Sequence, residues 1–276
     1  IGDLVAGFKV IGSLDPCDEF PAVPPADCAT VEELLTTARW AQHAAKGHLR
    51  KLGEAARGAY DTCVKEAGET GTMRGPFTAD QVSQLLGAAW VPVPRFMVAH
   101  ERPIDDASIY GQNATVGVPW KVTLGGVDEV AGLAVVWVRA VREDRIVEIR
   151  LPSGEVLVGA LHPDWSVKAA RTLVARLADL KSAYRQLAAF PGHAFATVVA
   201  ALNEETEEVM YFIPRALLFG ESAAVYGFNR GSRFLSTVLS RCGDLVVSSY
   251  YDDFTQQETE ELGEPATPTL KGARRR

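Results

Sequence analysis

The spacing of apolar and polar positions predicts a helical first quarter of the chain. Four prolines break regular structure within the first thirty residues. Thr30 and Glu33 then form a capping-box pattern, which predicts the start of a helical region that is interrupted near Gly47 or Gly53. A second such pattern, Thr78 with Gln81, predicts a helix that Gly87 ends.

Shorter periodic segments follow. The segment 89–99 is apolar and extended, and its prolines favour an edge strand. Residues 126–143 have helical spacing, and no chemistry beyond a core helix is needed to explain them. Residues 145–161 alternate around Pro152-Ser153-Gly154 and predict a hairpin.

From residue 171 the order of elements becomes informative. A strand ends at Asp179 and is followed by a short helix; two strands, 195–202 and 209–214, are joined by a polar turn. A helix over 221–242 precedes a strand and a sharp reversal at 244–254. The order strand, helix, strand, strand, helix, strand predicts an α+β fold, an antiparallel sheet covered by helices on one face.

Composition changes this picture little. The chain has 276 residues, 47 % of them hydrophobic, and a net charge of −7, which fits one large or two modest domains and argues against a general nucleic-acid coat protein. The four cysteines lack metal-ligand spacing and predict free thiols in a reducing compartment. With no apolar run of about 18 residues and no signal peptide, we expect an intracellular protein without a membrane partner.

Three carboxylates suggest chemistry. Asp179 and the pair Asp252–Asp253 each come at the end of a predicted strand. If those strand ends are neighbours, the carboxylates provide hard oxygen ligands for Mg²⁺ or Mn²⁺, and two such ions can drive nucleotidyl transfer. Taken separately, an Asp-Asp doublet or a single Asp after a strand is more typical of a solvated turn.

Four segments together give a more specific signal. DLKSAYRQL (179–187), the turn and helix of 213–230, YYDDF (250–254) and ERPIDDASIYGQNA (101–114) resemble motif A, motif B, motif C and a fingers segment of reverse transcriptases. The sequences of these segments are most similar to those of retroelement polymerases abundant in protist genomes. The resemblance covers about residues 90 to 256 and includes HPDW (162–165), to which no chemical role is assigned.

The resemblance implies a right-hand polymerase palm with fingers elements and a helical N-terminal region. It assigns 1–77 to an N-terminal loop and helical region, 78–170 to fingers, 171–256 to the palm and 257–276 to a disordered tail. The short remainder after YYDDF lacks a thumb, a primer grip and a ribonuclease H, which predicts a truncated or degenerate copy.

The resemblance also implies site roles. The catalytic metal ligands are Asp179, Asp252 and Asp253, which hold two Mg²⁺ or Mn²⁺ ions. The residues that serve the incoming deoxynucleoside triphosphate are Arg102, Leu180, Tyr184, Phe219 and Gly220, with Tyr184 as the steric gate against a 2′-hydroxyl. Lys181 and Arg185 are expected to contact the phosphates of an RNA or DNA template or primer. Phe219 departs from the Gln of retroviral relatives.

Plainer interpretations stay open. Tyr184 could be a core aromatic, and Arg102 could be a surface partner of Asp105 or Asp106. The protein could be a non-catalytic, domesticated palm that binds nucleic acid or acts as a scaffold. It could also be another palm-type nucleotidyl transferase, such as a cyclase-like enzyme, although YYDDF favours the polymerase over the glycine-rich hairpin of that class.

Overall fold

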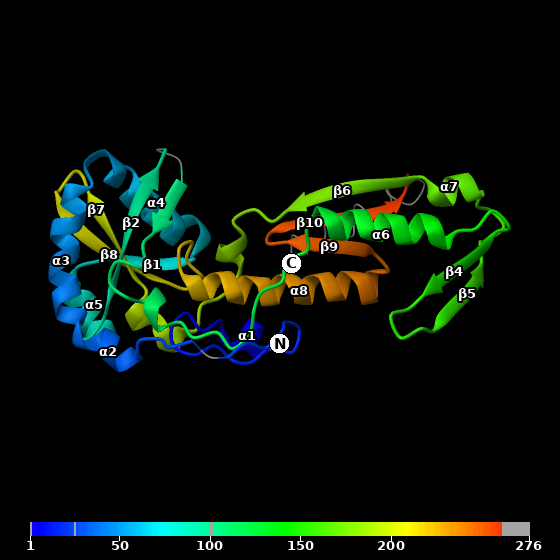
Figure 1. Cartoon of the computed structure of the whole chain (residues 1–276). Coiled ribbons are helices and arrows are strands. Elements are labelled where there is room, and N and C mark those ends of the chain that lie inside the picture. Colours follow the sequence, from blue (N-terminus) through cyan, green and yellow to red (C-terminus); the bar gives the residue numbers. More distant parts are fainter. Residues whose placement is uncertain (1, 25, 100–101, 261–276) are drawn as a thin grey trace. The chain divides into compact units, whose positions relative to one another are not determined.

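A computed structural model describes residues 2–24, 26–99 and 102–260 (Figure 1). The chain forms two compact units, each built from two separate stretches of sequence. The first unit comprises Ile1–Val122 and Ser182–Arg230, and the second comprises Thr123–Lys181 and Gly231–Arg276. The sheet of each unit joins strands from both of its stretches, so the units do not follow the four continuous regions expected from the sequence.

The first unit combines short helices with a mixed sheet. Its α-helices are α1 (Gly2–Ala6), α2 (Val31–Thr36), α3 (Ala38–Lys51), α4 (Ala59–Lys65) and α5 (Ala79–Leu86). Its short 3-10 helices are η1 (Gly53–Ala56), η3 (Asn113–Thr115), η4 (Ala183–Gln186) and η5 (Pro191–Ala196), and η2 (Glu66–Thr70) is a short π-helix. Its strands are β1 (Met73–Phe77), β2 (Pro92–Val98), β3 (Arg102–Asp105), β7 (Val198–Asn203) and β8 (Glu208–Pro214).

The second unit contains a smaller sheet, a separate hairpin and two helices. Its strands are β4 (Ile146–Arg150), β5 (Val156–Ala160), β6 (Leu173–Asp179), β9 (Val246–Tyr250) and β10 (Asp253–Thr259). Its helices are α6 (Val127–Ala140) and α7 (Val167–Arg171). The helix α8 (Ser222–Gly243) contributes its first residues to the first unit and the others to the second.

Both capping boxes are confirmed. The Thr30 hydroxyl accepts from the Glu33 N–H while the Glu33 carboxylate accepts from the Thr30 N–H, and Thr78 and Gln81 make the same reciprocal pair. The last turn of α5 ends at Gly87, whose φ of 85° suits a residue without a side chain. These local signals place helix starts because they depend only on residues within one turn.

The sheet of the first unit has the order β1-β8-β7-β2-β3. Its residues alternate between two apolar layers, as the period of a strand requires. Val198 and Ala200 of β7 pack with Leu49 of α3 and Val82 of α5. Val199, one position along, packs on the opposite face in a cluster that includes residues of α4. Helices therefore cover both faces of this sheet.

The expectation of an edge strand at 89–99 is wrong, because β2 lies between β7 and β3. The strand accommodates its prolines because its two halves pair with different neighbouring strands. Pro92–Pro94 pair with β7 only, in parallel, and Arg95–Val98 pair with β3 only, antiparallel. Each half of the strand thus pairs with one neighbouring strand, so the missing proline N–H groups interrupt no second ladder.

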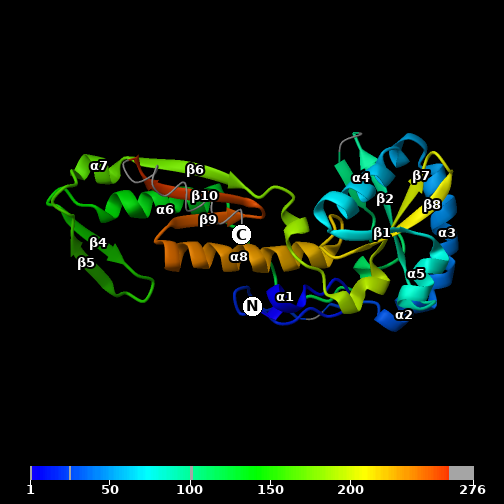
Figure 2. The same ribbon diagram turned by 180° about the vertical axis from the view of Figure 1, so that it is seen from behind.

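The second unit holds an antiparallel sheet of order β6-β10-β9. Phe254 of β10 and Ala178 of β6 pack against Leu239 of α8 on one face. Gln257, of opposite parity in β10, donates to the carbonyl of Val130 in α6. Both faces carry a helix, as Figures 1 and 2 show for α6 and α8, so the expectation of helices on one face is wrong.

Two further expectations are corrected by the strand pairings. The strands predicted at 195–202 and 209–214 do pair with each other, but as β7 and β8 they belong to the sheet of the first unit. They are therefore not part of one sheet with β6, β9 and β10. In addition, β10 continues to Thr259, so residues 257–259 are strand and not tail. Residues 261–276 lie outside the described part of the chain.

Candidate functional site

The three aspartates predicted to act together lie in one corner of the second unit. Asp179 is the last residue of β6 and Asp253 the first of β10, and the two are directly opposite each other in the antiparallel register. Opposite residues point to the same face of a sheet, with β-carbons about 5 Å apart. Asp252 is in the turn between β9 and β10, and its carbonyl accepts from the Leu180 N–H at 3.1 Å.

The carboxylates influence one another electrostatically. Asp179 and Asp253 are exposed, while Asp252 is half-buried. Partial burial raises the pKa of Asp252, the hydrogen bond from its own backbone opposes this, and the negative charges of Asp179 and Asp253 raise it further. A cation near the three groups would remove this repulsion. The donor chemistry therefore fits a hard divalent ion such as Mg²⁺ or Mn²⁺.

The side chains as they stand do not enclose an ion. Among the described residues, no three His, Cys, Asp or Glu side chains are grouped closely enough to hold a metal. The backbone register brings the three aspartates to the same strand ends, but their carboxylates do not form such a group. The expected pair of ions thus stays a prediction.

The turn that presents Asp252 has an unusual backbone. Tyr250 pairs with Asp253, which leaves only Tyr251 and Asp252 in the loop. Tyr251 has a φ of 51°, a left-handed value that costs a non-glycine residue about 1 kcal/mol or more. Its carbonyl accepts from the Ser232 hydroxyl of α8 at 3.0 Å, so the helix helps to hold the turn.

The residues expected to serve the nucleotide belong to the first unit, apart from Leu180. Arg102 is exposed at the start of β3. The Tyr184 ring lies between two aromatic rings, with centroids 5.8 Å from Phe219 and 5.1 Å from Phe228. Phe219 is 50 % exposed. Tyr184 is thus packed on aromatic neighbours, which fits both a core aromatic and an oriented gate.

Gly220 is required by close backbone approach. Its φ is 120°, and a β-carbon at this position would collide with the carbonyl oxygen of Asp105. Asn113 fixes the same turn from the side: its amide donates to the Gly220 carbonyl at 3.0 Å and accepts from the Ser222 N–H at 2.7 Å. The segments that resemble the fingers and motif B are therefore in direct contact within the first unit.

A buried ionic network underlies this turn, and the sequence reasoning missed most of it. Arg95, fully buried in β2, binds Asp105 through two hydrogen bonds of 2.7 and 3.0 Å and Glu66 through one of 2.8 Å. An Arg within an apolar strand was the available signal, because a buried guanidinium requires an anionic partner. Asp105 is therefore the partner of Arg95 and not of Arg102.

Arg185 belongs to the same network. Its guanidinium lies 3.2 Å from both Glu66 and Asp105 and donates to the Leu217 carbonyl at 3.1 Å. These contacts occupy both ends of the guanidinium, and its side chain is 15 % exposed. The expected contact of Arg185 with template or primer phosphate stays a prediction, and these partners would compete with it. Lys181, by contrast, is exposed in the second unit.

Glu221 is a second buried acid that the sequence did not reveal. It directly follows Gly220 and is 3 % exposed. Burial raises its pKa to about 8; the Leu218 N–H, which donates to it at 3.2 Å, opposes the rise, and Asp105 and Arg185 act in opposite directions. Near neutral pH this carboxyl is therefore mostly protonated, which removes the cost of a buried charge beside the turn.

All four cysteines are unpaired, as expected, and burial raises the pKa of the Cys63 thiol to about 12.

Comparison of the chain with protein-family models and with curated proteins finds no match. None of the helices in the described part of the chain combines the length and the apolar character that crossing a bilayer demands.

Proposed function

We propose that the protein is a template-directed nucleotidyl transferase, an RNA-directed DNA polymerase derived from a retroelement. The observation that carries this proposal is the pairing of Asp179 with Asp253 across β6 and β10, with Asp252 in the adjoining turn. A strand end and a hairpin turn thereby bring together carboxylates that are more than seventy residues apart in sequence. The electrostatic effect of the other two aspartates on Asp252 supports the same grouping.

The proposal gives each acidic residue a defined role. Asp179 and Asp252 would be the main ligands of two Mg²⁺ or Mn²⁺ ions, with Asp253 and the Leu180 carbonyl beside them. Such ions make a primer 3′-hydroxyl more acidic and stabilise departing pyrophosphate. The carboxylates themselves must be ionised to bind, so the raised pKa of Asp252 predicts that binding weakens as the pH falls.

The residues of the first unit have proposed roles toward the deoxynucleoside triphosphate. Arg102 is exposed, and its planar guanidinium would bind phosphate oxygens. Tyr184, oriented by two aromatic neighbours, would reject a 2′-hydroxyl by steric clash. Gly220 would allow close backbone approach, with the exposed Phe219 ring beside it, and Lys181 would contact a template or primer phosphate. An RNA or DNA template and these substrates imply an intracellular location.

Primer extension on an RNA template tests the proposal. The wild-type chain should add deoxynucleotides with Mg²⁺ or Mn²⁺, and EDTA should stop the reaction. Asp252→Asn should lower incorporation by at least about a hundredfold, the scale on which the loss of a key electrostatic group acts. Asp244→Asn, an exposed aspartate of the same unit, is the matched control and should leave incorporation unchanged. Equal incorporation by the wild type and Asp252→Asn, or none by either, would contradict the enzymatic proposal.

A non-catalytic nucleic-acid-binding or scaffold role is the second candidate. It is favoured by the absence, among the described residues, of side chains already grouped around a metal position. In that case a primer–template duplex should bind with the same affinity to the wild type and to Asp252→Asn, in the presence or absence of Mg²⁺, and neither should extend it. The cyclase-like alternative is less supported, because Tyr251 and Asp252 occupy the turn in place of glycines.

A further inference from the structure

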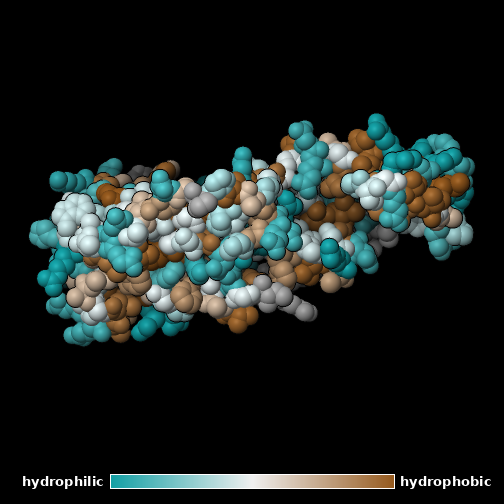
Figure 3. All heavy atoms as spheres, turned by 60° about the horizontal axis from the view of Figure 1, so that its bottom comes forward, coloured by the Kyte–Doolittle hydropathy of each residue, from teal (hydrophilic) through white to brown (hydrophobic). Residues whose placement is uncertain are grey.

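The cavities of the two units are more informative than their surfaces. On the face of the first unit that Figure 3 shows, at the left of the view, hydrophilic and hydrophobic side chains are interspersed. Hydropathy therefore does not single out a docking surface on that face. The cavities differ from one another in the charge of the side chains that line them.

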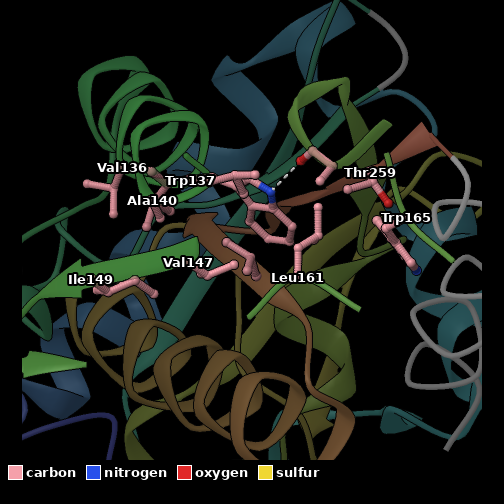
Figure 4. A pocket seen from close by; sticks show the side chains of 12 residues that line it. Val136, Trp137, Ala140, Val147, Ile149, Leu161, Trp165 and Thr259 are labelled. Atoms are coloured by element: carbon pink, nitrogen blue, oxygen red, sulfur yellow. Dashed lines mark hydrogen bonds between the residues drawn. The ribbon is translucent and has the colours of Figure 1, made fainter. Parts of the chain in front are cut away.

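A cavity of the second unit, drawn in Figure 4, has an apolar lining. The described side chains that line it are apolar apart from Thr259 and two tryptophans. The indole N–H of one of these, Trp137, donates to the Ala170 carbonyl at 3.0 Å, and the Thr259 hydroxyl is buried. Neither group is available to select a ligand, so this cavity carries no inference.

A cavity of the first unit combines apolar walls with arginines. Its volume is about 500 Å³, which falls within the usual range of small-molecule sites. It lies between the end of α1, β1, the end of α5, the segment 188–194 and the end of β8. Leu85 and Leu86 supply an aliphatic wall from α5, and Ile213 and Pro214 supply another from β8.

Two arginines, Arg74 and Arg215, line the same cavity from neighbouring strands. Arg74 is directly opposite Ile213 in the antiparallel ladder of β1 and β8. The Arg215 N–H continues this ladder by donating to the Thr72 carbonyl at 2.7 Å. Arg74 is thus two positions from the residue opposite Arg215. The two long side chains therefore share one face of the sheet as diagonal neighbours, within reach of a common ligand.

Neither guanidinium has a carboxylate partner within the described part of the chain. The ion pairs found there do not include Arg74 or Arg215, and the described lining of the cavity contains no acidic residue. Arg74 lies over the Phe77 ring at 6.0 Å, a contact that leaves its N–H donors available. Both arginines are exposed, so a ligand can reach them. An anion between them would remove the repulsion of two like charges.

We propose that this cavity binds a small molecule with an apolar body and a phosphate monoester head group, which Arg74 and Arg215 hold between them. Two guanidinium groups match the two charges of such a head group and can donate to its oxygens in pairs. The aliphatic walls would cover the apolar body. The residues proposed to serve nucleotidyl transfer are absent from this lining, so the inference stands whether or not that proposal is correct.

Calorimetric titration with 2-naphthyl phosphate tests this inference. The second pKa of a phosphate monoester is about 6, so the measurement is made at about pH 8, where the head group carries two charges. 2-Naphthol lacks the head group, and inorganic phosphate lacks the apolar body. The wild type should bind 2-naphthyl phosphate saturably and at least about tenfold more tightly than either, because only the ester uses both parts of the cavity.

Replacement of one arginine at a time tests the head-group contacts. Arg74→Gln and Arg215→Gln should each weaken 2-naphthyl phosphate binding about tenfold or more, as expected for the loss of a charge-assisted hydrogen bond, and leave 2-naphthol binding unchanged. Arg39→Gln is the matched control, since Arg39 is an exposed arginine of α3 in the same unit and does not line the cavity. It should bind 2-naphthyl phosphate like the wild type.

A further variant tests the cavity itself. Ala188 is exposed and lines the cavity, so Ala188→Leu should narrow it and weaken 2-naphthyl phosphate binding at least about tenfold, although both arginines remain. Thermal unfolding checks that each variant still folds. Lack of saturable binding by the wild type would overturn the inference. Equal affinities for inorganic phosphate and the ester, which indicate an adventitious ion only, would also overturn it, as would unchanged affinity in both arginine variants.

Discussion

At the scale of single residues, Glu221 makes a pH-dependent contribution to stability that can be isolated. Its pKa rises from an ordinary 4.5 to about 8 in the folded protein. Between these pH values the unfolded chain has lost the proton and the folded chain retains it. Since stability falls with rising pH wherever the folded state holds more protons, this group destabilises the protein progressively from pH 4.5 to about 8 and adds nothing further above that.

Glu221→Gln should remove that dependence. The variant and the wild type should have similar free energies of unfolding near pH 4.5, and the variant should be more stable by at least about 1 kcal/mol at pH 8, since one unit of pKa shift corresponds to about 1.4 kcal/mol. Urea unfolding at pH 4.5, 6.5 and 8.5 measures this. The control, Glu205→Gln, changes an exposed turn residue. Its free energy of unfolding should depend on pH in the same way as that of the wild type. Parallel curves for Glu221→Gln would refute the role of burial.

The same scale shows where sequence reasoning reached its limit. Asp179, Asp252 and Asp253 could be grouped because each follows a strand, and strand ends can be recognised locally. The roles of Arg185 and Asp105 depend on Arg95 and Glu66, which come from other elements of the first unit. No local pattern encodes those distances. A basic residue near an acidic motif was therefore assigned to phosphate, although the fold uses it to neutralise buried carboxylates.

At the scale of elements, the sequence predicted which segments are helices or strands. It did not predict which strands share a sheet. Capping boxes, alternation and a turn such as Pro152-Ser153-Gly154 are local, and the helices and the hairpin follow them. The strands β7 and β8 were also recognised, but their sheet was assigned wrongly. Their buried residues are consecutive and compatible with any apolar neighbour, so the choice of β1 and β2 as partners is fixed only by the tertiary structure.

The β9–β10 hairpin provides a test at this scale. Tyr251 occupies a left-handed position, which Asn tolerates and a β-branched residue does not. Tyr251→Asn and Tyr251→Val both lose the ring contact with Tyr250, so they form a matched pair. Tyr251→Val should be less stable than Tyr251→Asn by about 1–2 kcal/mol in urea unfolding. Amide hydrogen exchange in the hairpin should be faster in Tyr251→Val than in Tyr251→Asn. Equal stabilities would mean that this turn stores no backbone strain.

At the scale of the whole molecule, the chain alternates between its units. It leaves the first unit after Val122, returns at Ser182 and leaves again after Arg230. The larger sheet of each unit is completed only when the later stretch has been added, because β8 and β7 lie between β1 and β2, and β10 lies between β6 and β9. Folding of either unit therefore depends on contacts between residues far apart in the sequence, which is associated with slow folding.

This interleaving predicts which pieces of the chain fold. Ile1–Val122 alone contains β1, β2 and β3 but lacks the two strands that separate β1 from β2, so apolar residues such as Val93 would lose their β7 neighbours. We expect this fragment to show no cooperative thermal transition in far-UV circular dichroism. Joining Ile1–Val122 to Ser182–Arg230 through a flexible Gly/Ser linker restores all five strands. This fusion should melt cooperatively.

The buried valines of β7 supply the control for that experiment. Val199 is fully buried in the central strand of the sheet, and Val199→Asp in the fusion places an unpaired charge in the core. The variant fusion should lose the transition, since an uncompensated buried charge costs several kcal/mol. A cooperative transition of the isolated Ile1–Val122 fragment, equal to that of the fusion, would show instead that the first stretch contains a complete folding unit and that β7 and β8 are later additions to its sheet.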